Sequence, residues 1–86
     1  MAKVVMYSTG LCPYCIRART LLNKKSVDYI EYRLDKEPQY RAEMEARSGQ
    51  TSVPQIFIDD FHVGGFDELS ELDIDDKLDP MLGLNE

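Results

Sequence analysis

The stretch that decides the fold is Val4-Val5-Met6-Tyr7-Ser8-Thr9-Gly10-Leu11-Cys12-Pro13-Tyr14-Cys15. Its first four residues form a short apolar run with β-branched side chains, which predicts a buried strand over residues 4–7. Ser8-Thr9-Gly10 then interrupts the apolar pattern. Because proline lacks an N–H and suits the first position of a helix, Pro13 predicts that a helix begins near Cys12. The stretch therefore places two cysteines where a strand passes into a helix.

The residues after Pro13 predict a helix with one apolar face and a basic end. Lys24 and Lys25 stand where the C-terminus of a helix prefers positive charge. The residues that share the predicted inner face are Ala18, Leu21, Leu22 and Lys25.

The rest of the chain predicts three more strands and two more helices. The expected elements are a strand over 29–34, a helix over 38–47, strands over 55–58 and 61–63, and a helix from residue 67. Ser48-Gly49 ends the middle helix, and Asp59-Asp60 is expected to form the turn of a hairpin. Asp67 is a good N-cap for the last helix, with Leu69 and Leu72 on one face.

The order of these elements, βαβαββα, predicts the fold class. A helix joins the first two strands, so they are expected to be parallel with a right-handed crossover, and the hairpin adds an antiparallel edge. A four-stranded mixed sheet flanked by three helices is an α/β architecture of the thioredoxin-like type. We expect residues 1–86 to form one such domain, as suits a chain of 86 residues.

No part of the sequence reads as a membrane span or a targeting segment. The apolar run at residues 4–7 is far shorter than the roughly 20 residues that a spanning helix needs. We therefore expect a cytoplasmic protein with no membrane partner. In that compartment two cysteines are more often catalytic or metal-bound than a structural disulfide.

The net charge of −6 is unevenly distributed along the chain. Residues 1–58 carry nine Lys or Arg and six Asp or Glu, whereas residues 59–86 carry one Lys and ten Asp or Glu. No acidic residue lies between Ser8 and Val27, where the basic residues are Arg17, Arg19, Lys24 and Lys25. These cations either favour a thiolate and an anionic substrate or simply cover a solvated helix face. No basic stripe alternates with aromatic residues, so nucleic acid is not an expected partner.

Cys12 and Cys15 are the residues most clearly suited to chemistry. At a helix start, unpaired backbone N–H groups and the helix dipole stabilise a negative sulfur, so Cys12 is expected to be the nucleophile. Cys15 lies one turn further in, where it is more buried and can resolve a mixed disulfide on Cys12.

A zinc site and a structural disulfide are weaker interpretations of the two cysteines, and a catalytic base is a weaker interpretation of His62. A structural zinc site needs four ligands, and the chain offers two cysteines and His62, so no metal site is expected. A structural disulfide across so short a loop contributes little stability. His62 alternates with Phe61 and Val63 on an edge strand, which predicts a solvated strand residue rather than a catalytic base.

Two loops offer ligand-binding features whose role the local pattern leaves open. Val53-Pro54 is either an ordinary turn before a strand or a cis bond that turns the Val53 backbone toward an extended, peptide-like ligand. Gly64-Gly65 permits close backbone approach, and Asp67 either caps its helix or holds a ligand ammonium, or does both.

Taken together, three segments resemble the glutaredoxin family over essentially the whole chain. They are Cys12-Pro13-Tyr14-Cys15, Thr51-Ser52-Val53-Pro54-Gln55-Ile56-Phe57-Ile58 and Gly64-Gly65-Phe66-Asp67-Glu68-Leu69. The Cys-Pro-Tyr-Cys segment is similar to the dithiol class, and the chain looks most like the small bacterial members. The resemblance implies a glutathione-dependent disulfide oxidoreductase with catalytic Cys12 and Cys15, glutathione as co-substrate and no tightly bound cofactor.

The resemblance also implies a glutathione site. Cys12 would bond the glutathione sulfur beside Tyr14, and the Val53 backbone would pair with the cysteinyl part. The implied glutathione-binding residues are Tyr14, Arg41, Ser52, Val53, Pro54, Gly65, Phe66 and Asp67. Pro54 would be cis, the Phe66 N–H and the Asp67 carboxylate would hold the γ-glutamyl end, and Arg41 would meet the glycine carboxylate.

Three positions differ from the family pattern, and one of them keeps the functional group. Thr9 stands where the family commonly has a lysine, which removes one cation expected near the thiolate. Phe66 stands where a bacterial relative often has a cysteine. Ser52 replaces a threonine and keeps its hydroxyl.

The expected partners are glutathione and oxidised or glutathionylated proteins, and the expected state is a monomer. Protein–glutathione mixed disulfides would be reduced through Cys12 alone, and protein disulfides through Cys12 and Cys15. One alternative is a thioredoxin-like reductant recycled by a flavoenzyme reductase. The chain lacks the tryptophan that would precede the first cysteine in such a protein, and it has no tryptophan at all. A second is a dimeric iron–sulfur cluster carrier, a role for which the resemblance would favour Gly-Phe-Ser after the first cysteine.

Overall fold

Four strands form one mixed sheet in the order β2-β1-β3-β4. The computed structural model describes residues 2–84. Its elements are β1 (Val4–Ser8), α1 (Pro13–Lys24), β2 (Ile30–Arg33), α2 (Tyr40–Ser48), β3 (Gln55–Ile58), β4 (Phe61–Gly64), α3 (Phe66–Ile74) and α4 (Leu78–Leu82). β1 pairs in parallel with β2 and antiparallel with β3, and β3 pairs antiparallel with β4. These pairings confirm the parallel crossover and the hairpin predicted from the sequence.

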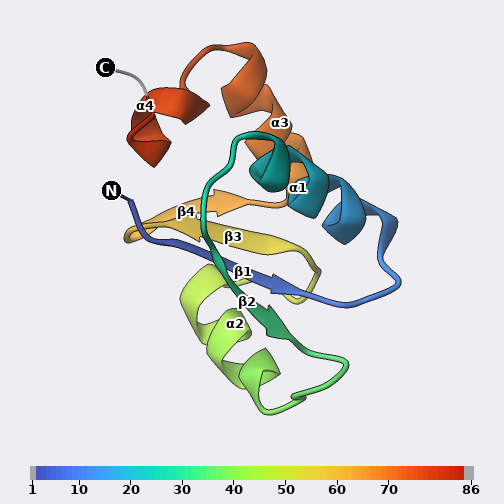
Figure 1. The fold of residues 1–86 in the computed structure, drawn as a ribbon. Coiled ribbons are helices and arrows are strands. Elements are labelled where there is room, and N and C mark those ends of the chain that lie inside the picture. The colour runs from blue at the N-terminus through green and yellow to red at the C-terminus, as the bar shows by residue number, and fades with distance from the viewer. Residues whose placement is uncertain (1, 85–86) are drawn as a thin grey trace.

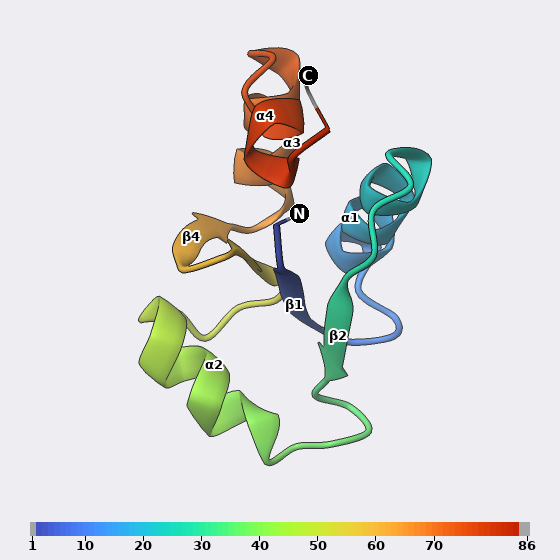
Figure 2. The same ribbon diagram turned by 60° about the vertical axis from the view of Figure 1, so that its left-hand side comes forward.

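Helices cover both faces of the sheet. Figures 1 and 2 show α2 on one face, α1 and α3 on the other, and α4 next to α3. Because successive residues of a strand point to opposite faces, β1 contributes to two separate apolar clusters. Val4 and Met6 pack in the cluster under α1, α3 and α4, whereas Val5 and Tyr7 pack in the cluster on the α2 side.

Cys12 ends the loop between β1 and α1, and Cys15 lies in the first turn of α1, so both cysteines stand at one end of the sheet. α1 begins at Pro13, as predicted, and Ala18 and Leu22 are fully buried on its inner face. Lys25 follows α1, and its Nζ lies 2.7 Å from Asp73 of α3 and 2.7 Å from Asp79 of α4. These ion pairs link the C-terminal end of α1 to α3 and α4, in the acidic C-terminal part of the chain.

Several element boundaries differ from the sequence-based expectation. β1 extends to Ser8, because Ser8 is buried and pairs with Arg33 of β2. β2 is shorter than the predicted range 29–34. The middle helix starts at Tyr40, since Pro38 and its neighbour form a turn in which the Arg41 N–H bonds the Pro38 carbonyl at 3.1 Å.

Two further differences lie near the C-terminus. The prediction that Asp67 is the N-cap of the last long helix is wrong: Gly65 is the N-cap and Asp67 lies in the first turn. The Glu68 carboxylate accepts the Gly65 N–H at 2.7 Å, so the helix end is capped from within its own first turn. The short helix α4 was not expected, and it buries Leu78 and Leu82 against the core.

The domain predicted over residues 1–86 includes Met1 and residues 85–86, which lie outside the described part of the chain. Within residues 2–84, no helix is long and apolar enough to cross a membrane.

Candidate functional site

Cys12 occupies the N-cap of α1. Its backbone is extended, with φ −77° and ψ 119°, and its Sγ accepts the Cys15 N–H at 3.3 Å. The Sγ also lies 3.8 Å from the carbonyl oxygen of Val53, toward which the thiol can donate. Cys12 is half-buried, so its sulfur is open to a ligand. A negative sulfur at this position faces the unpaired N–H groups and the positive end of the helix dipole.

Cys15 has a different environment. It is fully buried, and this burial raises the pKa of the Cys15 thiol to about 11. The Thr9 backbone and the Arg19 guanidinium favour the ionised form, but desolvation outweighs them. The structure therefore separates an accessible sulfur from a buried one that stays a thiol at neutral pH.

We expect the burial of Cys15 to make the reduced protein less stable at alkaline pH. In the unfolded chain Cys15 ionises near its ordinary pKa of about 9, but in the folded chain its pKa is about 11. Above pH 9 the unfolded state binds fewer protons, so the free energy of unfolding falls by about 2 kcal/mol up to pH 11. Urea unfolding of the reduced protein across this range measures the loss.

Cys15→Ala is the matched control for this pH dependence. It keeps every other group that titrates at alkaline pH, so its loss of stability should be smaller by that amount. Identical curves for Cys15→Ala and the unmodified chain would contradict the assignment.

The basic residues around α1 are more fully paired than their sequence positions indicate. Arg19 lies 2.6 Å from Glu31 and donates to the Thr9 carbonyl at 3.0 Å, so it braces the loop beneath Cys15. Arg17 lies over the Tyr14 ring at 5.4 Å. Arg19 and Lys25 are thus held in ion pairs, so neither of them simply covers a solvated helix face.

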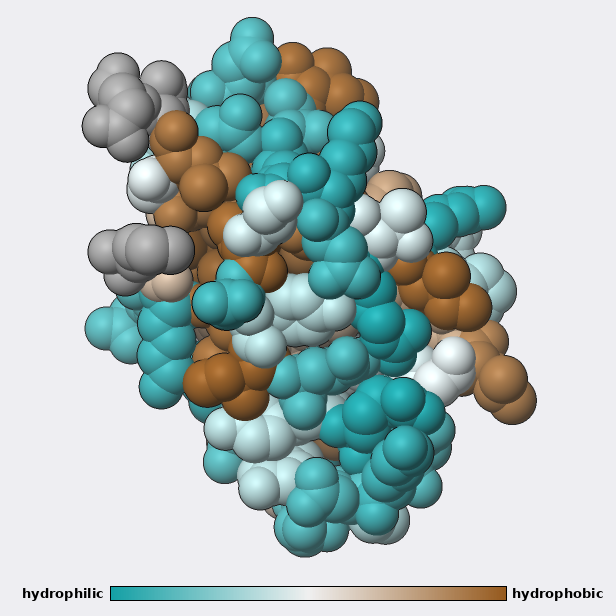
Figure 3. Space-filling view, in the orientation of Figure 1, coloured by the Kyte–Doolittle hydropathy of each residue, from teal (hydrophilic) through white to brown (hydrophobic). Residues whose placement is uncertain are grey.

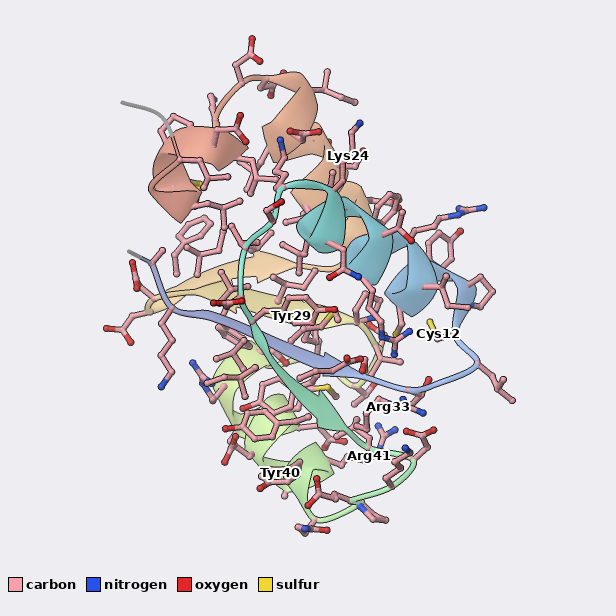
Figure 4. All side chains as sticks on the ribbon, in the orientation of Figure 1. Cys12, Lys24, Tyr29, Arg33, Tyr40 and Arg41 are labelled. Carbon is pink, nitrogen blue, oxygen red and sulfur yellow. The ribbon has the colours of Figure 1, made fainter. Side chains whose placement is uncertain are left out.

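Arg33 and Asp35, which the sequence analysis did not single out, clasp the loop before Cys12. The two side chains pair at 2.8 Å, and Asp35 accepts the Gly10 N–H at 3.1 Å. A Cβ on Gly10 would lie 2.1 Å from Arg33 Nη2, so glycine is what allows this close approach. Figure 4 shows Arg33 on the same edge of the molecule as Cys12.

A cleft of about 530 Å³ opens beside Cys12, between α1, the loop before β3 and the start of α3. It brings together seven of the residues singled out from the sequence: Tyr14, Ser52, Val53, Pro54, Gly65, Phe66 and Asp67. It is also lined by residues that the sequence analysis did not assign to a site: Gln50, Gln55, His62, Val63, Gly64 and Glu68. The Val53–Pro54 bond is cis, as one of the two interpretations of that dipeptide requires.

Three expected site residues are not among those that line the cleft: Cys12, Cys15 and Arg41. The Cys12 sulfur lies 3.8 Å from the carbonyl oxygen of Val53, which does line it. Arg41 lies further away, on α2. Its guanidinium donates to the Thr51 carbonyl at 3.1 Å and lies 3.7 Å from Glu45. Arg41 thus supports the loop that precedes Ser52, on the same edge as Cys12 in Figure 4.

His62 lies on the edge strand β4, as predicted from the sequence, but it is less solvated than expected. It is half-buried and pairs across the hairpin with Phe57, on whose ring it stacks at 4.8 Å. Its Nε2 lies 2.7 Å from Oε1 of the buried Gln55. The alternation of β3 places Gln55 on the same face as Phe57, a signal that could have brought Gln55 and His62 together from the sequence.

Large apolar side chains near Cys12 are exposed on the surface. Leu11 is 94% exposed, and Tyr14 and Ile16 are each 49% exposed. In Figure 3 apolar residues gather at the right-hand edge, over the loop before α1 and its first turns, whereas mostly hydrophilic residues cover α2. Within residues 2–84, no group of three or more His, Cys, Asp or Glu side chains is placed to hold a metal ion.

The fold and the cysteine pair define a thioredoxin-fold thiol–disulfide oxidoreductase. The family model named Glutaredoxin matches residues 4–63. The chain is 50% identical over 82 residues to "Glutaredoxin" of Pseudomonas aeruginosa, which covers 95% of this chain and 98% of the relative. It is also 50% identical over 82 residues to "Glutaredoxin 3" of Escherichia coli (strain K12), covering 95% and 99% of the two chains.

Solved structures agree with these relatives. The buckwheat glutaredoxin–glutathione complex superposes with a TM-score of 0.87 at 34% identity, over 95% of this chain and 77% of that one. The glutaredoxin of Brucella melitensis superposes with a TM-score of 0.82 at 43% identity, over 100% and 94% of the two chains. The chain belongs to the glutaredoxin family. Its activity is that of a glutathione-dependent thiol–disulfide oxidoreductase.

Proposed function

We propose that Cys12 is the nucleophile that reduces protein–glutathione mixed disulfides. Its thiolate attacks the glutathione sulfur, the S–S bond breaks, and the protein thiolate leaves and takes up a proton. A second glutathione thiolate then attacks the glutathione sulfur bonded to Cys12. Glutathione disulfide leaves and the Cys12 thiolate is restored. The observation that carries this proposal is the accessible Cys12 sulfur at the N-terminus of α1, beside the cleft.

For protein disulfides we propose that both cysteines act. Cys12 forms a mixed disulfide with the substrate, and Cys15, which becomes a thiolate as it attacks, displaces the substrate thiol and closes the Cys12–Cys15 disulfide. Two glutathione molecules then reduce that disulfide. The position of Cys15 one turn into α1 supports this order, since its N–H already contacts the Cys12 sulfur at 3.3 Å.

The cleft is the proposed glutathione site. The Val53 backbone would pair with the cysteinyl part beside Cys12, and Tyr14, Ser52 and Pro54 would frame it. At the other end Gly65, the Phe66 N–H and the Asp67 carboxylate would hold the γ-glutamyl group, supported by the free N–H groups in the first turn of α3. Arg41 would act at the glycine carboxylate by moving from Thr51, or through the loop that it supports.

The proposed working form is a cytoplasmic monomer. A dithiol that is recycled by glutathione needs a reducing compartment, which supports the cytoplasm. The proposed protein substrates are glutathionylated and oxidised proteins.

Turnover of a glutathionylated peptide tests the proposal. Regeneration by glutathione and glutathione reductase is expected to sustain turnover, whereas thioredoxin reductase should not. Turnover sustained by thioredoxin reductase alone would favour the thioredoxin-like alternative.

We expect Asp67→Asn to weaken substrate binding. The variant removes the charge that would hold the ligand ammonium at an exposed position, so KM for the glutathionylated peptide should rise about fivefold with little change in kcat. Asp60→Asn is the matched control, because Asp60 is an exposed turn residue outside the cleft. Equal KM values in the two variants would contradict the role of Asp67.

A further inference from the structure

Hydrogen bonds connect His62 to Ser52 through one buried amide. The Gln55 side chain is 3% exposed and lies between the two residues. Its Nε2 donates to the Ser52 carbonyl at 3.0 Å and lies 3.4 Å from the Ser52 hydroxyl oxygen. Its Oε1 lies 2.7 Å from His62 Nε2. All three residues line the cleft.

The Ser52 carbonyl fixes the direction of these hydrogen bonds. A carbonyl oxygen can only accept, so the NH2 end of Gln55 faces Ser52 and its oxygen faces His62. His62 must therefore donate from Nε2, either as the Nε2–H tautomer or as the imidazolium.

The imidazole is itself held by the core on the α2 side. Its ring stacks on Phe57, with an interplanar angle of 26°. The guanidinium of Arg47 lies over the Phe57 ring at 4.1 Å and donates to the Tyr7 hydroxyl at 3.1 Å. His62 is thus a fixed donor rather than a freely rotating surface group.

We infer that His62 is a positioning residue for the ligand-binding loop. It orients the Gln55 amide, which holds Ser52 and so fixes the neighbouring Val53 backbone that would pair with the ligand. The inference rests on the proposed glutathione site and assigns His62 a role in substrate affinity. His62 contacts no reacting atom, so the rate of the chemical step at Cys12 does not depend on it.

Two substitutions separate the hydrogen bond from the aromatic packing. His62→Phe keeps a ring on Phe57 but removes the donor. His62→Gln loses the ring but restores a donating nitrogen. Phe61→Ala is the control, since Phe61 is an exposed aromatic residue on the same strand and outside the cleft.

His62→Phe is expected to raise KM for a glutathionylated peptide by roughly threefold to tenfold, the range of one hydrogen bond, with kcat within about twofold. His62→Gln should recover most of the affinity, and Phe61→Ala should match the unmodified chain. The alkylation rate of Cys12 by iodoacetamide should be the same in all of them. Unchanged KM in His62→Phe would overturn the inference, and so would an equal rise in His62→Phe and His62→Gln.

A second measurement needs no variant. In the unmodified protein, the ring-nitrogen chemical shifts of His62 are expected to show a proton on Nε2, whereas a proton on Nδ1 alone would overturn the inference even if a variant fails to fold. Failure of the proposed function has a different signature. The unmodified protein would then show no glutathione-dependent turnover, although His62 carries the Nε2 proton.

Discussion

Cys12→Ser is expected to abolish reduction of both protein–glutathione mixed disulfides and protein disulfides. Both proposed routes begin with attack by the Cys12 sulfur, and a hydroxyl at neutral pH is a far weaker nucleophile than a thiolate. The rate should fall by roughly a thousandfold or more, to the level of uncatalysed exchange. Turnover of a glutathionylated peptide and of a protein disulfide measures the two losses.

The Cys12→Ser variant should keep its fold, so a loss of activity can be assigned to the missing thiol rather than to unfolding. Cys12 is the N-cap of α1, where its Sγ accepts the Cys15 N–H. Serine is a better N-cap than cysteine, so the helix should be at least as stable. Circular dichroism and urea unfolding check this point. A folded Cys12→Ser variant that still turns over the glutathionylated peptide would show that Cys12 is not the nucleophile.

The first half of the fold could be predicted because its signals are local. An apolar run gives β1, and Pro13 can occupy only the first turn of a helix without breaking it, so the start of α1 follows directly. The hairpin follows from two apolar runs around Asp59-Asp60. The same features bring Cys12 to the end of the sheet.

The sequence did not predict α4 or the N-cap of α3, because both depend on contacts that a local pattern does not show. α4 has only five residues and includes Pro80, so it has no periodic pattern to recognise. It exists because Leu78 and Leu82 complete the core above the sheet. The N-cap assigned to Asp67 failed because the Glu68 side chain already accepts the Gly65 N–H.

The sequence predicts the cleft residues that lie in short motifs. It does not predict the contacts that form between segments distant in the sequence. Val53-Pro54 and Phe66-Asp67 stand in recognisable segments, and all four residues line the cleft. The contact between Gln55 and His62 depends on the register of β3 against β4, and the Arg33–Asp35 clasp depends on the absence of a side chain at Gly10. The alternation of β3 places Gln55 on the face of Phe57, but no local pattern fixes the register that brings His62 to that face, and none encodes the Arg33–Asp35 pair.

Cys15→Ser should divide the two activities that Cys12→Ser removes together. In the proposed mechanism a second glutathione resolves the mixed disulfide between Cys12 and glutathione, so turnover of the glutathionylated peptide should stay within about threefold. Reduction of a protein disulfide needs an internal thiol to displace the substrate. We expect that activity to fall roughly a hundredfold or more, since an external thiol lacks the effective concentration of a neighbouring group.

The intermediate that accumulates makes this second prediction specific. Because the buried Cys15 thiol is no longer present to displace the substrate, a covalent complex between Cys12 and the substrate protein should persist and be visible by mass spectrometry under non-reducing conditions. Cys15→Ala is the companion variant, since serine adds a buried hydroxyl at a fully buried position and alanine does not. If both folded variants also lose turnover of the glutathionylated peptide, Cys15 takes part in the reduction of protein–glutathione mixed disulfides. That result would contradict the proposal that this reduction needs Cys12 alone.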